Sequence, residues 1–271
     1  MLLVISAYKV CIIVISAYEV CGGTDMNNKK DDNYQIISEP IESANPILFN
    51  GFPGTGLIGN IACQHIIDKL KMVQKGTINS RYFPPIAVLS NGIINMPVRI
   101  YESTEHNILI IISDIPIHPA VAYDISKEIV NWAKTINVKE IVPIAGIATM
   151  SGEHKVFGSA TTSQMLEKIK DVVEIFQVGT ISGIAGSVMI ACHLQEMPAI
   201  SLLGETHSQN PEPRAAIAVI EALNKIYNLN IDIQDLVEQT KEIEMEMQKL
   251  ADQVRNTEGV PPPRKEFPMY G

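Results

Sequence analysis

The stretch PILFNGFPGTGLIGNIACQHIIDKL, residues 46–70, decides how this sequence is expected to fold. PILF (46–49) is a short apolar run that ends at the glycine-rich segment GFPGTGLIGN (51–60), which is typical of a strand that enters a tight turn. From Leu57 onward apolar residues recur every three to four positions, and this spacing predicts a helix. The order strand, glycine-rich turn, helix is how α/β folds begin.

Downstream of this unit, apolar runs continue to alternate with helical patterns. Strands are predicted at 86–90, 98–103, 107–113, 140–146 and 198–205, helices at about 120–136 and 211–227, a helix start within 158–171, and a second glycine-rich turn at 178–186. The run NILIIIS (107–113) is continuously apolar, as in a strand that is covered on both faces. We therefore expect an α/β fold with a mostly parallel sheet flanked by helices.

Composition and charge exclude several functional classes. Apolar residues make up 46% of the chain and charged residues 19%, which fits a globular body with a sizeable core. The net charge of −9 argues against binding to nucleic acid or to an anionic membrane surface, because both require an excess of Lys and Arg. The four cysteines form no CxxC pair, so neither a disulfide framework nor a metal site is expected, and a reducing cytoplasm is the simplest location.

The N-terminal residues 1–35 are expected to lie outside the fold, as an extension and linker. VISAYKVC (4–11) recurs almost unchanged as VISAYEVC (14–21), and a polar run follows Met26. Each apolar copy is too short for a transmembrane helix, and Lys9 interrupts the pattern of a secretory signal. Two hypotheses stay open: an appended β-prone segment, or a translation start at Met26.

The C-terminal part differs in kind from the α/β body, which is expected to span 36–230. Within a predicted helix at 231–258, apolar positions follow the 4, 3, 4, 3, 4 spacing of a coiled-coil seam, namely Leu236, Thr240, Ile243, Met247, Leu250 and Val254. A stripe of this length also fits a surface helix that packs on its own domain, and both interpretations stay open. Residues 259–271 contain Pro261–Pro263 and are expected to form an extended arm that ends in Met269-Tyr270-Gly271.

The segment Gly54–Gly59 matches the dinucleotide-binding pattern GxGxxG between a strand and a helix. That fingerprint also needs an acid about 20 residues later to hold the ribose hydroxyls, and residues 75–90 contain no Asp or Glu. The Lys-Ser/Thr pair of a phosphate-binding P-loop is missing as well. We therefore predict a structural turn with close helix packing and no bound cofactor.

An enzyme is the main alternative. Asp114 follows one predicted central strand, and Glu205 with His207 ends another, where α/β enzymes place functional groups. If these side chains converge on one pocket above the glycine-rich turns, nucleoside or acyl chemistry becomes a candidate, and a ligand-sensing scaffold is a further one. The opposing interpretation is that Asp114 caps a helix or turn and that Glu205 and His207 anchor the loop before Pro211.

Three stretches together resemble the proteasome assembly chaperones of the PAC2 type, in particular the archaeal homologues. They are GFPGTGLIGN (51–60), PIAGIAT with TISGIAG (143–149 and 180–186), and LLGETHSQNPEPRAAIAVIEAL (202–223). The family pattern usually has Asp-Pro before Arg-Ala-Ala, whereas this chain has Glu212-Pro213. The resemblance implies a fold similar to nucleoside phosphorylases with a three-layer core, no established catalytic residues, and a role in building or binding the 20S proteasome.

The resemblance also implies a binding role for the last three residues. Proteasome activators and several of these chaperones end in a hydrophobic residue, Tyr and any residue, as Met269, Tyr270 and Gly271 do here. Such a C-terminus is expected to enter a pocket between two α subunits of the 20S particle. One short arm binds weakly, so a homo-oligomer that presents several arms is part of the expectation.

Overall fold

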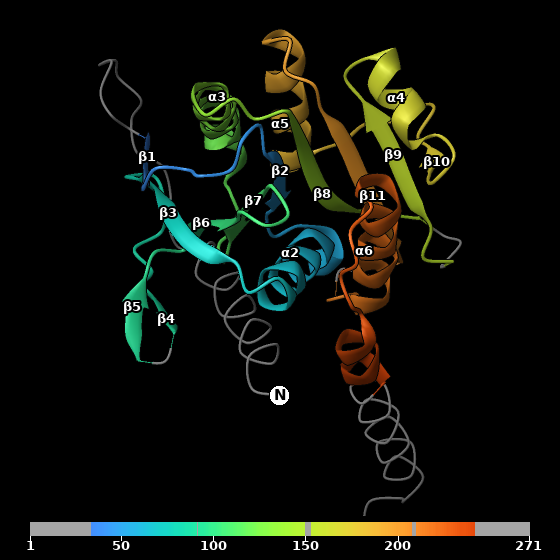
Figure 1. Ribbon diagram of the computed structural model, residues 1–271, viewed down its shortest axis with the longest axis horizontal. Helices are drawn as coiled ribbons and strands as arrows, with labels where there is room; N and C mark the ends of the chain where they lie inside the picture. The colour runs from blue at the N-terminus through green and yellow to red at the C-terminus, as the bar shows by residue number, and fades with distance from the viewer. Residues whose placement is uncertain (1–33, 91, 150–152, 208–209, 242–271) are drawn as a thin grey trace, which may run out of the picture.

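A computed structural model describes residues 34–90, 92–149, 153–207 and 210–241 of the 271-residue chain. In these residues nine strands form one sheet between layers of helices, and two short strands form a separate sheet (Figure 1). The large sheet contains β1 (Tyr34–Ser38), β2 (Ile47–Gly51), β3 (Val73–Ser80), β6 (Val98–Ser103), β7 (Ile108–Ser113), β8 (Glu140–Ala148), β9 (Val156–Ala160), β10 (Glu174–Ile175) and β11 (Ile200–Thr206). The small sheet contains β4 (Val88–Ser90) and β5 (Ile93–Asn95). The helical elements are η2 (Thr55–Leu57), α2 (Ile58–Lys69), α3 (Pro119–Thr135), α4 (Ser163–Ile169), α5 (Gly183–Leu194) and α6 (Pro213–Tyr227).

The strand order in the large sheet is β1-β3-β6-β7-β2-β8-β11-β9-β10. The four central strands β7, β2, β8 and β11 are parallel neighbours, and β9 and β10 are also parallel. Antiparallel pairs join β1, β3, β6 and β7 on one side, and β11 to β9 on the other. The predicted α/β fold is confirmed, and its parallel centre follows the strand and helix alternation read from the sequence.

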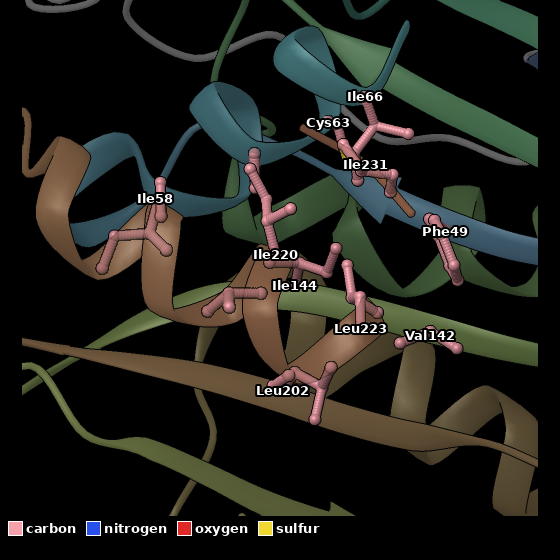
Figure 2. Packing of buried hydrophobic residues seen from close by; sticks show 14 of the residues in the cluster. Phe49, Ile58, Cys63, Ile66, Val142, Ile144, Leu202, Ile220, Leu223 and Ile231 are labelled. Atoms are coloured by element: carbon pink, nitrogen blue, oxygen red, sulfur yellow. The ribbon is translucent and has the colours of Figure 1, made fainter. Parts of the chain in front are cut away.

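Two apolar cores cover the two faces of the sheet. One lies under α2, α4 and α6 and the other under α3 and α5. Figure 2 shows the first core, where side chains from α2 and α6 meet those of the strands below, among them Ile58, Ile66, Ile220, Leu223, Val142, Ile144 and Leu202. All six residues of β7 are buried, which confirms that its continuous apolar run is a strand covered on both faces.

The edge of the sheet begins earlier than the sequence suggested. Tyr34 and Gln35, assigned above to a linker, are the first residues of β1, which pairs antiparallel with β3. Along β1, half-buried residues alternate with exposed ones, as expected for an edge strand. Its sequence therefore lacks the strongly apolar pattern by which a buried strand is recognised. Residues 1–33, with both copies of the repeat, lie outside the described residues.

The predicted strand at 86–90 does not join the large sheet. Its second half is β4, which pairs with β5 as a hairpin that projects from the body (Figure 1). Three apolar side chains of the hairpin, Leu89, Ile93 and Ile94, are 68%, 73% and 71% exposed. The apolar residues that suggested a core strand therefore lie on the surface of the hairpin.

The start of the C-terminal helix belongs to the domain's own core. Residues 234–241 are helical, and Leu236, the first seam position, is 2% exposed within the core under α2 and α6. Thr240, the next seam position, is also buried, and Lys69 of α2 forms ion pairs with Asp232 and Asp235. The first turns of the stripe thus pack on their own domain, and its remaining positions lie outside the described residues. No helix in the described part of the chain is both long and apolar enough to span a bilayer.

Candidate functional site

The predicted docking residues Met269, Tyr270 and Gly271 lie outside the described residues, so the geometry available concerns the α/β body. In this body the most distinctive place is the edge of the sheet where the parallel strands β2, β8 and β11 end. Carboxyl ends of parallel strands are where α/β folds place their ligand and partner sites.

The three stretches that carry the family resemblance meet at this edge. The backbone N–H of Glu212, just before α6, donates to the carbonyl of Gly56 at 2.8 Å, and the N–H of Thr149 donates to the carbonyl of Thr206 at 2.9 Å. A cavity at the same place is lined by residues 53–55, 143–148 and 180–185. Segments that are far apart in the sequence therefore form one structural unit.

The first glycine-rich turn is closed by direct backbone packing. A Cβ atom on Gly59 of α2 would lie 2.2 Å from the carbonyl oxygen of Ile144 in β8. A Cβ atom on Gly146 of β8 would lie 2.0 Å from the carbonyl oxygen of Thr55 in the turn. Since real side chains never approach a backbone oxygen so closely, both positions require glycine, which supports the interpretation of Gly54–Gly59 as a packing turn.

The surroundings of this turn also differ from those of a dinucleotide site. The strand after α2 is β3, which pairs with β1 and β6, whereas β2 lies between β7 and β8. In a dinucleotide-binding fold the strand after the first helix lies beside the first strand and places its acid near the ribose. The end of β3 is therefore remote from the turn. This distance gives a geometric reason to expect that no dinucleotide binds, which stays a prediction.

A cavity of about 310 Å³ lies between the first turn, the end of β8 and the beginning of α5. Its walls combine apolar side chains, such as Phe52 and Val188, with nearly as much polar surface, and none of its lining residues is charged. Asn50 of β2 also lines it and is only 2% exposed. Sequence analysis passed over Asn50, although a lone amide inside the apolar run ILFNG was the available signal.

Asp114 is held in an ion pair. Both terminal nitrogens of Arg99 in β6 donate to its carboxylate, one of them at 3.2 Å, and Arg99 also donates to the Tyr101 hydroxyl at 3.1 Å. Burial alone would lower the pKa of the Arg99 guanidinium, but the bond to Asp114 and its charge outweigh burial and raise it. A two-point contact of this kind between guanidinium and carboxylate is typical of a structural ion pair.

Glu205 is likewise engaged by its neighbours. Its side chain is 1% exposed and accepts hydrogen bonds from the Thr149 hydroxyl and, at 3.1 Å, from the backbone N–H of Lys155. His207 lies on the exposed loop that follows β11. Asp114, Glu205 and His207 are all absent from the lining of the cavity, so the structure does not bring the predicted enzyme residues together there.

The described residues contain no group of three or more His, Cys, Asp or Glu side chains arranged to hold a metal ion. Cys63 and Cys192 are both buried and unpaired, and burial raises the pKa of the Cys192 thiol to about 12. Their thiols therefore stay protonated and inert as ligands or nucleophiles at neutral pH.

Comparison with known sequences identifies relatives over most of the chain. A family model described as the PAC2 family matches residues 48–251. The uncharacterized protein MJ0106 of Methanocaldococcus jannaschii is 37% identical over 230 residues, which cover 85% of this chain and 94% of that protein.

Solved structures with the same fold include two proteins of Pyrococcus furiosus. PbaA, described as an archaeal homolog of proteasome-assembly chaperone, superposes with a TM-score of 0.77 and 30% identity, covering 83% of this chain and 94% of that chain. PbaB, described as an archaeal proteasome activator, superposes with a TM-score of 0.72 and 26% identity, covering 82% of this chain and all of that one (100%).

Proposed function

Because this chain belongs to the PAC2 family, we propose that it is a non-enzymatic assembly chaperone or activator of the 20S proteasome that docks on the α ring through its C-terminus. The observation that carries the proposal is the ending Met269-Tyr270-Gly271 behind the proline run Pro261–Pro263. Its structural similarity to PbaA and PbaB, two archaeal proteins described as a chaperone homolog and an activator, supports the same partner.

The docking chemistry follows from the three residue types. The carboxylate of Gly271 pairs with a cation in a pocket between α subunits, and the Tyr270 ring buries apolar area while its hydroxyl finds a polar partner. Met269 fills an apolar groove, for which its flexible thioether side chain is suited. Proline restricts the backbone before it binds, so a segment with three prolines loses less conformational entropy on binding.

Absence of catalysis is part of the proposal. The two carboxylates that an enzyme at this edge of the sheet was expected to use, Asp114 and Glu205, are bound by Arg99 and by Thr149 with Lys155. A general acid or base needs a free position beside its substrate. We therefore infer that these two carboxylates hold neighbouring loops and strands in place and do not act as a general acid or base.

A homo-oligomer is the second part of the proposal, because several arms on one particle give useful avidity where one arm binds weakly. The β4–β5 hairpin offers the contact surface for a second copy. Leu89 and Ile94 are partners across the hairpin and form an exposed apolar patch on one of its faces, and paired amide hydrogen bonds between Gln74 and Asn95, at 3.1 and 2.9 Å, fix the hairpin to β3. A rigid, exposed apolar patch is typical of a protein interface.

Light scattering tests this contact. The double change Leu89→Lys and Ile94→Lys is expected to reduce the mass of the particle to that of smaller species, because two desolvated charges would oppose association. Val178→Lys is the matched control, since Val178 is an isolated apolar side chain that is 91% exposed. An unchanged mass in the double variant would assign the oligomer contact to another surface.

The docking proposal is tested by a pull-down on purified 20S particles with the full-length chain and with a variant that ends at residue 268. We expect the full-length chain to retain 20S particles and the shortened chain to lose them. Retention by both would show that another surface makes the contact, and retention by neither would favour an enzyme or a ligand-sensing scaffold. Repeating the pull-down with free α subunits separates an assembly chaperone from an activator of the mature particle.

A further inference from the structure

Asn50 is a buried polar residue without a described partner. Its side chain is 2% exposed, and neither its amide nitrogen nor its amide oxygen has a hydrogen-bond partner among the described residues. An unpaired buried amide is costly, and such groups in folded proteins usually have a specific reason to be there. Asn60, a second buried asparagine ten positions later, shows the ordinary arrangement, since its amide nitrogen donates to the carbonyl of Ser113 at 2.6 Å.

The Asn50 side chain points into the cavity. Side chains alternate between the two faces of a strand, and Leu48 and Phe52, two positions before and after Asn50, both belong to the core under α3 and α5. Asn50 therefore faces the same side, where the cavity lies between β8 and the beginning of α5. Its amide, which has two donors and an acceptor, is the unpaired buried polar group at this wall of the cavity.

The beginning of α5 supplies a second polar feature to the same cavity. Thr180, Ser182 and Gly183 line it, and α5 starts at Gly183, whose φ of +68° lets the chain turn into the helix. Ser182, the residue before the helix, makes no side-chain capping bond, and the first turn contains no acidic residue. The N–H groups at the start of a helix lack acceptors within the helix and favour a negative charge.

The lining sets the class of ligand. A cavity of about 310 Å³ with both polar and apolar walls is within the size range of small-molecule sites. Because no lining residue is charged, a multiply charged ligand such as a nucleotide would lose its hydration without a compensating cation. One negative charge, placed at the start of α5, is the most that these groups can stabilise.

We propose that this cavity binds a small organic acid with one carboxylate and one amide-like group. The carboxylate lies at the N-terminus of α5, and the amide-like group exchanges hydrogen bonds with Asn50. The site is separate from the proposed docking arm, and the family's glycine-rich turn forms one of its walls at Gly54 and Thr55. A ligand there would join β2, β8 and α5 and so stabilise the fold against unfolding.

The test uses the full-length protein, succinamate as the probe and ligand-observed saturation-transfer NMR. Succinamate carries a carboxylate at one end and a carboxamide at the other, and for so small a molecule a dissociation constant of about 1 to 10 mM is expected. Succinamide, which lacks the charge, and butyrate, which lacks the amide, are expected to bind at least about fivefold more weakly. Absence of saturable succinamate binding, or equal binding of all three probes, would overturn the proposal.

Two variants locate the binding. Asn50→Leu removes the amide and Ala145→Met fills the cavity from β8, and each is expected to weaken succinamate binding at least about tenfold. Asn79→Leu, on the exposed part of β3, is the matched control and should bind as the parent does. Circular dichroism confirms that each variant is folded, and a folded Asn50→Leu or Ala145→Met variant with parental affinity would contradict the assignment of the site.

Discussion

The two glycine-rich turns of this protein, Gly54–Gly59 and Gly179–Gly186, look alike in sequence but differ in what they contact. The first lies against backbone, with Gly59 packed on the carbonyl of Ile144 and Gly146 packed on that of Thr55. The second turn leads into α5 at Gly183, where an added Cβ atom would meet nothing within 4 Å, and it opens on the cavity beside Asn50.

The difference shows why a glycine motif does not by itself identify a binding site. In the first turn Gly59 is required because the main chains of α2 and β8 approach each other, whereas Gly54 and Thr55 line the cavity. In the second turn Gly186 is packed on its own turn, since an added Cβ atom would lie 2.0 Å from the carbonyl oxygen of Ile181, whereas Gly183 has open space and leads into the helix whose N-terminus borders the cavity. Both turns thus border the cavity, and only the packed glycine of the first turn joins two elements that are far apart in the sequence.

The largest effect is expected from Gly59→Ala. Helix propensity alone predicts that this change in α2 stabilises the protein by about 1 kcal/mol. Packing predicts the opposite sign, because the new methyl group would lie 2.2 Å from the Ile144 carbonyl oxygen and would separate helix from strand. We expect a loss of about 3 kcal/mol in the free energy of unfolding, measured by urea denaturation.

Gly54→Ala is the matched control for this change. Gly54 has an extended backbone with φ of −164°, and an added Cβ atom would meet nothing within 4 Å. Its effect should stay within about 0.5 kcal/mol. Equal destabilisation by both changes, or stabilisation by Gly59→Ala, would refute the packing role of the first turn.

The two buried asparagines, Asn50 and Asn60, should differ in how much they contribute to stability, although this effect is smaller. Asn60→Leu leaves the Ser113 carbonyl without its donor and is expected to cost about 1 to 3 kcal/mol. Asn50→Leu removes an amide that has no described partner, so the ligand-free protein should keep or slightly gain stability. Thermal midpoints at one protein concentration would show this, with a fall of roughly 3 to 10 °C for Asn60→Leu alone. A similar fall for Asn50→Leu would mean that Asn50 has a structural partner.

The smallest effect, no detectable heat of binding, is expected when nucleotides are added to the protein. Titration of NAD, NADP and ATP by calorimetry should give no micromolar binding, because residues 75–90 contain no acid and β3 does not lie beside β2. Micromolar binding that is lost in Gly56→Val would contradict this prediction and support the enzyme alternative.

The sequence predicted the parallel centre of the fold well because fully buried strands are continuous apolar runs. β7 and β8 were visible in this way, whereas α6 was visible from its helical pattern with proline in the first turn, and each of the three lies within two residues of its predicted bounds. The edge strand β1 and the helix α5 were missed for opposite reasons. Two of the five residues of β1 are exposed and the other three are only half-buried, so its pattern is weak. In contrast, α5 (GIAGSVMIACHL) is apolar all round and contains two glycines, so it shows no amphipathic period.

The candidate site was less predictable because it depends on tertiary neighbours. Asp114 and Glu205 were correctly placed at strand ends, but whether they face a pocket depends on Arg99 and Thr149, which come from other segments. Asn50 is a polar residue in an apolar strand that the sequence patterns did not single out, and the absence of a partner can be judged only when all the groups around it are known.

Surface plasmon resonance on immobilised 20S particles shows whether the proposed C-terminal residues anchor the protein. Deleting Gly271 shifts the carboxylate by about 3.5 Å, and Tyr270→Ala removes an anchor that is typically worth about 2 to 4 kcal/mol per arm. We expect either change to abolish detectable binding, Tyr270→Phe to retain part of it, and light scattering to show an unchanged oligomer. Binding of both the deletion and Tyr270→Ala at parental affinity would show that these residues are not the anchor.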